Sequence, residues 1–140
     1  MNGFALHPQL TAETHPVGDL PLSRVLLMDD SNWPWLILVP RRADIREICE
    51  LDDEDQVQLM RESSQLASAL LELFKPDKLN IAALGNLVPQ LHLHHIVRHS
   101  YDAAWPSPVW GRLPRQPYLP ARARERVRQL GFQLGLPQSA

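Results

Sequence analysis

The fold of this chain is decided by one stretch, Gln90-Leu91-His92-Leu93-His94-His95-Ile96-Val97-Arg98. Apolar and polar side chains alternate in it, which predicts a β-strand over residues 91–98, because successive side chains of a strand point to opposite faces. One face is mostly apolar and should pack against helices; it carries Leu91, Leu93, His95 and Val97. On the other face, which the core does not need, His92 and His94 stand beside Gln90, and we expect the chemistry there.

The segments around this stretch predict an antiparallel sheet. Residues 24–28 and 35–39 are apolar runs separated by turn signals around Pro34, so they predict a hairpin. Because 35–39 is almost wholly apolar, we expect it to be covered on both faces. A further strand is expected at 78–84, ended by Gly85-Asn86. Strands and helices do not alternate strictly along the chain, which favours an α+β domain.

Two helices are expected between the hairpin and the later strands. A short helix is predicted over residues 43–51. A long helix follows, with carboxylates in its first turn from Asp52 to Asp55 that complement the helix dipole, and Pro76 stops it. Its core-facing stripe is predicted from steps of three and four to comprise Val57, Met60, Ser64, Ala67, Leu71 and Phe74.

The two ends of the chain carry weaker signals. Residues 1–20 show only turn signals. The segment 101–120 is rich in Pro and Trp, and we expect it to be ordered but irregular. A basic helix is predicted over 121–130, with its arginines spread around the helix rather than along one stripe.

Composition and charge exclude several classes of protein. A chain of 140 residues suits one domain, and a formal net charge of −2 offers no basic excess for nucleic acid. Cys49 is the single cysteine, so no internal disulfide can form, and a reducing compartment is the simpler expectation. The sequence shows neither a signal peptide nor an apolar run long enough to span a bilayer. We therefore expect a cytoplasmic protein that binds neither nucleic acid nor membrane.

Three interpretations of the paired histidines remain open. They could be surface histidines of a sheet. They could bind a metal ion, because alternate side chains of a strand can hold one ion, with His99, His15 or a carboxylate as a further ligand. They could also catalyse, because a neutral imidazole can attack phosphorus to form a phosphoramidate while a flanking His and Gln hold the phosphate oxygens. His95, on the apolar face, is expected to be a core histidine.

The stretch from Gly85 to Arg98 resembles the signature of the histidine triad (HIT) superfamily, in which histidines alternate with apolar residues after a Gly-plus-polar pair. The resemblance extends to the hairpin ending in Pro40-Arg41-Arg42, to the order of the helices, and to the run from Ala104 to Gly111, which is similar to the tail of a bacterial subgroup. It covers about residues 20–112. It implies a single HIT-like domain over 1–140, with an antiparallel sheet, one long and one short helix on one face, and a Pro/Trp-rich C-terminal extension and helix over about 113–140.

The resemblance also implies an activity and roles for particular residues. Family members hydrolyse or transfer nucleoside monophosphate groups, usually as homodimers, and need no metal or other cofactor at this motif. By that correspondence His92 is the nucleophile that forms a nucleotidyl-histidine intermediate, and His94 contacts the α-phosphate or the leaving group. Gly85 and Asn86 would contact phosphate. An acidic residue after the early strand would bind ribose, and the nucleotide-binding residues expected there are Asp30, or Asp29, with Asn32.

Two departures from the family pattern bear on the function. Gln90 replaces the first histidine, and a glutamine forms hydrogen bonds but cannot carry charge or shuttle a proton. His95 stands where the family usually has an apolar residue. We expect a hydrolase or transferase acting at the α-phosphate of a dinucleoside polyphosphate, a phosphoramidate or a nucleotidyl ester, with Gln90, His92 and His94 as catalytic residues. The alternatives are a nucleotide-binding module with little or no turnover, and a metal-dependent hydrolase using His92 and His94 as ligands.

Overall fold

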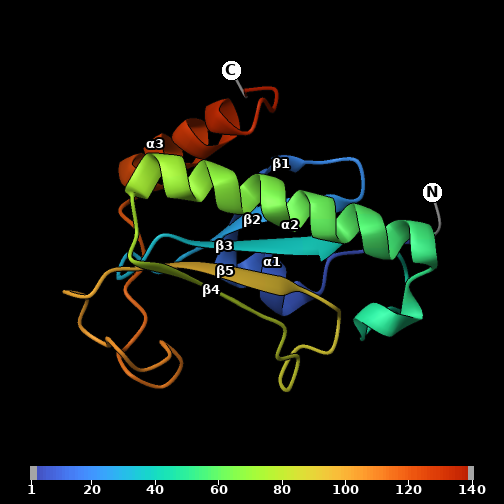
Figure 1. Cartoon of the computed structure of the whole chain (residues 1–140), viewed down its shortest axis with the longest axis horizontal. Helices are drawn as coiled ribbons and strands as arrows, with labels where there is room; N and C mark the ends of the chain where they lie inside the picture. The colour runs from blue at the N-terminus through green and yellow to red at the C-terminus, as the bar shows by residue number, and fades with distance from the viewer. Residues whose placement is uncertain (1–2, 139–140) are drawn as a thin grey trace.

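The computed structural model describes residues 3–138, and its centre is one antiparallel sheet. Five strands lie in the order β1-β2-β3-β5-β4, which confirms the predicted class of sheet. The motif strand β5 lies inside the sheet, between β3 and β4 (Figure 1). The strands are β1 (Thr14–Asp19), β2 (Ser23–Met28), β3 (Trp35–Pro40), β4 (Lys78–Ala82) and β5 (Leu93–Arg98).

Three helices and one 3₁₀ turn surround the sheet. The helices are α1 (Pro8–Glu13), α2 (Asp53–Phe74) and α3 (Pro120–Gln133), and the turn η1 spans Ile48–Glu50. Figure 1 shows α2 running the length of the sheet, with α3 beside it near β1. Within residues 3–138, none of the helices is both long enough and apolar enough to cross a bilayer.

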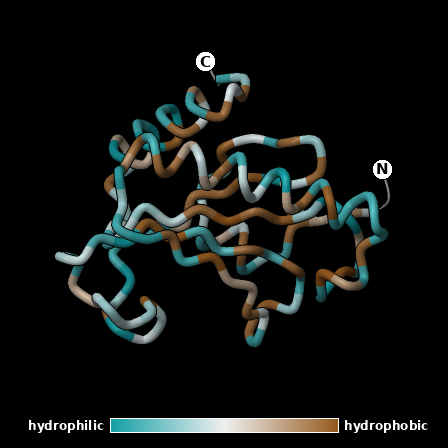
Figure 2. The backbone as a smooth tube through the Cα atoms, in the orientation of Figure 1, coloured by the Kyte–Doolittle hydropathy of each residue, from teal (hydrophilic) through white to brown (hydrophobic). Residues whose placement is uncertain are grey.

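Side chains of β3 pack on both faces of the sheet, as its apolar run predicted. Leu36 and Leu38 belong to a core cluster that includes Leu66 and Leu70 of α2. On the opposite face, Trp35, Ile37 and Val39 belong to a second cluster that includes Leu10 of α1. The tube in Figure 2 is accordingly hydrophobic along the middle of the sheet. We refer to these two sides as the α2 face and the α1 face.

The long helix begins and ends where the sequence predicts. The Asp52 carboxylate accepts a hydrogen bond from the Asp55 backbone N–H at 2.8 Å, which caps the first turn. Lys75 adopts a left-handed conformation, with φ of 48°, directly before Pro76. The capped start and the proline stop therefore place the helix correctly along the chain.

The predicted core stripe of this helix is wrong for most of its members, and of its large apolar residues Phe74 alone packs against the core cluster. Val57, Met60 and Leu71 are 52%, 66% and 49% exposed. The buried face instead carries Leu59, Glu62, Ser63, Leu66, Ala69 and Leu70. Two polar side chains on that face have buried partners: Glu62 accepts hydrogen bonds from the backbone N–H groups of Leu22 and Ser23 at 2.7 and 2.8 Å, and Ser63 meets His95. A buried polar group is tolerated when it is hydrogen-bonded, so apolar periodicity alone selected the wrong face.

Two further elements differ from the prediction. The short helix expected over 43–51 is reduced to the single turn η1. The first 20 residues, where only turns were expected, contain α1 and β1. Helix α1 has six residues, too few to show a helical period, and β1 is an edge strand with a register shift between Pro16 and Gly18. Neither element could display the pattern by which such segments are recognised in a sequence.

The Pro- and Trp-rich segment between β5 and α3 is irregular and ordered, as predicted. Ala104 and Val109 are buried in the cluster on the α1 face. Arg98, at the end of β5, is 2% exposed and donates to the Asp102 carboxylate at 2.8 Å and to the Asn80 side chain of β4 at 2.8 Å. This buried ion pair attaches the segment to the sheet beside the motif strand.

Candidate active site

The structure brings His92 and His94 together on the α1 face. His92 directly precedes β5 and His94 is its second residue. Their ring centroids are 4.8 Å apart at an interplanar angle of 70°, and the two residues are 6% and 5% exposed. The prediction that the two histidines share one face of the sheet is confirmed.

Both rings line a cavity of about 280 Å³. Its walls are mainly apolar, and the polar side chains in them besides the histidines are Gln9, Glu13 and Asn86. A small, mostly apolar cavity with a few convergent polar groups is the usual form of a small-molecule site. The apolar lining residues are Leu10, Met28, Trp35, Leu84, Leu87, Val88 and Trp110.

The hydrogen bond to the His92 ring determines its tautomer. Its Nδ1 lies 2.7 Å from the backbone carbonyl oxygen of Gln90. A carbonyl oxygen can only accept, so Nδ1 carries the proton and Nε2 of the neutral ring keeps a lone pair. The arrangement leaves Nε2 of His92 as a nucleophile or an acceptor.

His94 has the opposite tautomer. The indole Nε1–H of Trp35 donates to Nδ1 of His94 at 3.0 Å, so a neutral His94 carries its proton on Nε2. Burial, and then the nearby His92 and His95, lower the pKa of His94 from 6.5 to about 3. The ring is therefore neutral at pH 7 and can donate one hydrogen bond from Nε2. Trp35 and Trp110 hold it with edge contacts at centroid distances of 5.6 and 5.2 Å.

His95 lies on the α2 face and is a core histidine, as predicted. Its Nδ1 lies 3.2 Å from the Leu93 carbonyl oxygen and must donate there, so Nε2 accepts from the Ser63 hydroxyl at 2.7 Å. The residue is fully buried, and burial lowers its pKa from 6.5 to about 4. An apolar residue is not needed at this position because α2 supplies a hydroxyl group.

The glycine and asparagine predicted to contact phosphate lie at the cavity. Gly85 and Asn86 belong to the loop between β4 and β5, and both line the space in front of His92. Gly85 has a φ of 77°, a conformation that favours glycine, at the point of the loop directly before Asn86. Contact with a nucleotide remains a prediction for both residues.

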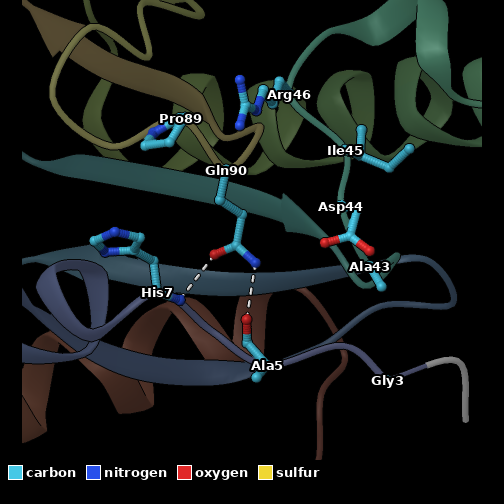
Figure 3. A pocket seen from close by; sticks show the side chains of 9 residues that line it. All are labelled: Gly3, Ala5, His7, Ala43, Asp44, Ile45, Arg46, Pro89 and Gln90. Atoms are coloured by element: carbon cyan, nitrogen blue, oxygen red, sulfur yellow. Dashed lines mark hydrogen bonds between the residues drawn. The ribbon is translucent and has the colours of Figure 1, made fainter.

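Gln90 lies elsewhere. Its side chain points to the N-terminal segment, where Oε1 accepts from the His7 backbone N–H and Nε2 donates to the Ala5 carbonyl oxygen, each at 2.9 Å (Figure 3). It borders a hollow of about 320 Å³ that also includes Asp44 and Arg46 and is separate from the cavity lined by both His92 and His94. The expectation that Gln90 lies with the two histidines at one site is therefore not met, because its amide is held by the N-terminal segment and does not line their cavity.

Asp30 and Asn32 do not line the cavity either. The Asp30 carboxylate accepts from the backbone and side chain of Asn32 at 3.0 and 2.8 Å, and the Asn32 amide also donates to the Pro114 carbonyl oxygen. These contacts attach the segment between β5 and α3 to the turn after β2. Asp29 is paired with His15 at 2.9 Å. The acidic side chain that the structure does place at the cavity is Glu13 of α1, which the sequence missed because α1 gave no recognisable pattern.

The further ligands that a metal site would need are elsewhere. His15 pairs with Asp29, and His99 contacts the Phe74 carbonyl oxygen at 3.1 Å. Within residues 3–138, no group of three or more His, Cys, Asp or Glu side chains is placed to hold a metal ion. His92 therefore offers one Nε2 lone pair, Nε2 of His94 carries a proton, and the described residues place no further ligand beside them.

Comparison with known proteins points to one family and fold. The HIT domain family model matches residues 9–101. A histidine triad protein from Bradyrhizobium japonicum is 50% identical, with a TM-score of 0.91 over 94% of this chain and 98% of that one. Another from Marinobacter aquaeolei is 53% identical, with a TM-score of 0.92 over 94% and 96% of the two chains. A third, from Sinorhizobium meliloti, is 41% identical, with a TM-score of 0.91 over 94% and 97%. Among curated proteins, none matches the chain significantly.

Proposed function

Since the chain belongs to the histidine triad (HIT) family, we propose that it hydrolyses or transfers the nucleotidyl group of a nucleoside phosphate derivative, with His92 as the nucleophile. The substrate classes are dinucleoside polyphosphates, nucleoside phosphoramidates and nucleotidyl esters. The observation that carries the proposal is the pair of tautomers at the cavity. Nε2 of His92 holds a free lone pair, and Nε2 of its neighbour His94 holds a proton.

The reaction proceeds in two displacements. Nε2 of His92 attacks the α-phosphorus, a P–N bond forms, and the bond to the leaving group breaks. The ring becomes cationic in this intermediate, and its Nδ1–H remains donated to the Gln90 carbonyl oxygen, which stabilises the charge. Water then attacks phosphorus, the P–N bond breaks, and a nucleoside monophosphate leaves with Nε2 restored; the proton lost by water passes to solvent.

His94 supplies a hydrogen bond rather than a proton. Its Nε2–H donates to a phosphate oxygen or to the leaving atom as negative charge develops there. The low pKa of His94 keeps the ring neutral at pH 7 before substrate binds, so in this mechanism a poor leaving group takes its proton from solvent. Asn86 and the backbone N–H groups beside Gly85 contact other phosphate oxygens, and the base packs on Leu10 and Met28.

A second candidate is a nucleotide-binding protein with little turnover, and two properties of the motif favour it. Gln90 cannot carry a proton, and the pKa of His94 is too low for it to act as an acid near neutral pH. The cavity would then bind AMP or GMP without cleaving any derivative. This candidate would be favoured over the enzyme if calorimetry detects nucleotide binding and if neither nucleoside phosphoramidates nor dinucleoside polyphosphates yield product.

The chain also presents one open sheet edge, and we propose that it pairs there as a homodimer. β4 has no strand on its outer side within residues 3–138, and Ile81 is 49% exposed on it. β1, the other edge, carries Pro16 and packs against α3. Unpaired backbone groups at an edge favour pairing with a second strand. Light scattering should detect a dimer, and Ile81→Lys should shift it toward monomer; a wild-type monomer at all concentrations would exclude the pairing.

The test of the enzyme uses two protein variants and one substrate panel. Nucleoside phosphoramidates and dinucleoside polyphosphates are incubated with wild type, with His92→Ala, and with the matched control His15→Ala, whose ring lies away from the cavity. His92→Ala should lower kcat by roughly 10⁴-fold or more, while the control stays within a few-fold of wild type. Mass spectrometry of the quenched wild-type reaction should find a nucleotidyl adduct on His92. Wild-type turnover in His92→Ala would exclude the mechanism.

A further inference from the structure

The N-terminal segment, residues 3–13, forms one wall of the cavity that holds His92. Leu10 is 2% exposed and belongs to the core cluster on the α1 face. Gln9, Leu10 and Glu13 all line the cavity in front of the two histidines. The stretch from Ala5 to His7 runs past the start of the motif, where Gln90 lies (Figure 3). The shape of the cavity therefore depends on where this segment is held.

Gln90 holds the segment with both ends of its amide. Oε1 accepts from the His7 N–H and Nε2 donates to the Ala5 carbonyl oxygen, each at 2.9 Å, across more than 80 residues of sequence. A backbone stretch with one donor and one acceptor two residues apart is matched by a carboxamide, which carries an acceptor and a donor side by side. A carboxylate would meet the Ala5 carbonyl oxygen with a second acceptor, and an aliphatic side chain would satisfy neither group.

His7, whose backbone N–H binds Gln90, is also the residue at which α1 starts. The His7 ring Nδ1 accepts from the Gln9 N–H at 3.1 Å, and the His7 carbonyl oxygen accepts from the Thr11 N–H at 3.0 Å, so His7 caps the helix. The two hydrogen bonds of Gln90 therefore set the position from which α1 starts. One turn further on, the helix presents Gln9, Leu10 and Glu13 to the cavity.

Glu13 gives this wall its chemical character. It is the acidic residue among those lining the cavity, and its Oε1 accepts a long hydrogen bond, 3.4 Å, from the Gln9 amide. A half-buried carboxylate acts as an acceptor for hydroxyl groups, such as those of a ribose. Asp30, the residue that the family resemblance suggested for this role, does not line the cavity, and its Oδ1 accepts hydrogen bonds from Asn32 and from the Gln116 backbone N–H.

We propose that Gln90 is a positioning residue that clamps the N-terminal segment against the His92 cavity, and that the wall so formed, with Glu13 in it, recognises the ribose hydroxyls of the substrate. This inference rests on the proposed function for the identity of the ligand. The clamp itself rests on the hydrogen bonds of Gln90 alone.

The clamp is tested with Gln90→Ala and Gln90→Glu, and with Gln133→Ala as the matched control, because the Gln133 amide also donates to one partner, Glu72, on the surface. Exchange of the His7 amide proton, followed by NMR, should accelerate at least about 10-fold in Gln90→Ala, which is the loss expected when a hydrogen bond worth ~1.4 kcal/mol is removed. It should accelerate less in Gln90→Glu, which keeps the acceptor, and not in the control. Unchanged exchange in Gln90→Ala would overturn the clamp.

Recognition is tested on the same variants with ribose and 2′,3′-dideoxyribose forms of one phosphoramidate. Gln90→Ala should raise KM for the ribose form about 10-fold, leave kcat within about 3-fold, and reduce the preference for the ribose form over the dideoxy form. A large fall in kcat at constant KM would instead make Gln90 a catalytic residue and overturn the proposal. If Gln90→Ala keeps the wild-type preference for the ribose form over the dideoxy form, the wall does not recognise the ribose hydroxyls.

These experiments distinguish failure of the proposed function from failure of the Gln90 clamp. Wild-type protein that forms no His92 adduct but binds AMP keeps the recognition test valid, with Kd from calorimetry in place of KM. Wild-type protein that neither turns over nor binds any nucleotide refutes both the proposed function and ribose recognition. The exchange of the His7 amide still decides whether Gln90 clamps the segment.

Discussion

His94 and His95 are consecutive residues of one strand, and their side chains lie on opposite faces of the sheet. Both are buried and burial lowers the pKa of both, so both are neutral at pH 7. They differ in the hydrogen-bonding state of the ring nitrogen Nε2. In His95 this atom accepts from Ser63 of α2, whereas in His94, a residue that lines the cavity, it carries a proton. The partner supplied by the surrounding elements, rather than the residue type or its burial, separates a structural histidine from one that the proposed reaction can use.

The largest effect is expected when the ring on the cavity side, His94, is removed. His94→Ala should lower kcat by about 10²–10³-fold, the usual effect of deleting one preorganised donor to a developing negative charge. Steady-state kinetics on a phosphoramidate measures it, with circular dichroism to verify folding. An activity equal to that of wild type would mean that the Nε2–H of His94 takes no part in the reaction.

The buried ring of His95, on the core side, should instead make the free energy of unfolding depend on pH. Below pH 6.5 the unfolded chain protonates His95, whereas the folded chain does not until about pH 4, so stability is complete above pH 6.5 and falls as the pH drops. Since one pKa unit corresponds to about 1.4 kcal/mol, the contribution of His95 is about 3 kcal/mol across this window. His94 acts in the same direction. Urea unfolding from pH 7 to pH 4 measures the change, and a flat profile would contradict it.

A smaller and more selective change removes only the partner of His95. Ser63→Ala leaves Nε2 of a buried imidazole without a hydrogen bond, which should lower the unfolding free energy by about 1–3 kcal/mol. Ser64→Ala is the matched control, because Ser64 is the adjacent residue of α2 and is exposed. Chemical denaturation of both variants measures the difference. Equal stabilities would mean that Ser63 does not satisfy His95.

The smallest effect is expected where the family motif is restored. Gln90→His should leave kcat within about 3-fold of wild type, because the side chain at position 90 contacts the N-terminal segment rather than the cavity. Presteady-state measurement of nucleotidyl transfer to His92 isolates this step from product release. An acceleration of transfer by 10-fold or more would show that a histidine at position 90 acts on the reaction.

The alternation of apolar and polar residues was enough to predict the sheet, the faces of β5 and the core role of His95. These inferences succeed because side chains of a strand alternate strictly and one slip would expose the whole apolar face. The stripe of α2 could not be predicted, because Glu62 and Ser63 are buried only through partners distant in sequence. The N-terminal wall of the cavity was missed since α1 is too short to show a period.

The sequence by itself determined that His92 and His94 share one face of a strand, that His95 lies on the other, and that Gly85 and Asn86 end the strand before them. Only the tertiary structure decided which ring nitrogen carries a proton, that Gln90 binds the N-terminal segment, and that Glu13 rather than Asp30 lies at the cavity. The physical reason is the range of the interactions. Alternation along a strand is local, whereas a tautomer or a clamp depends on a donor or an acceptor from a distant part of the chain.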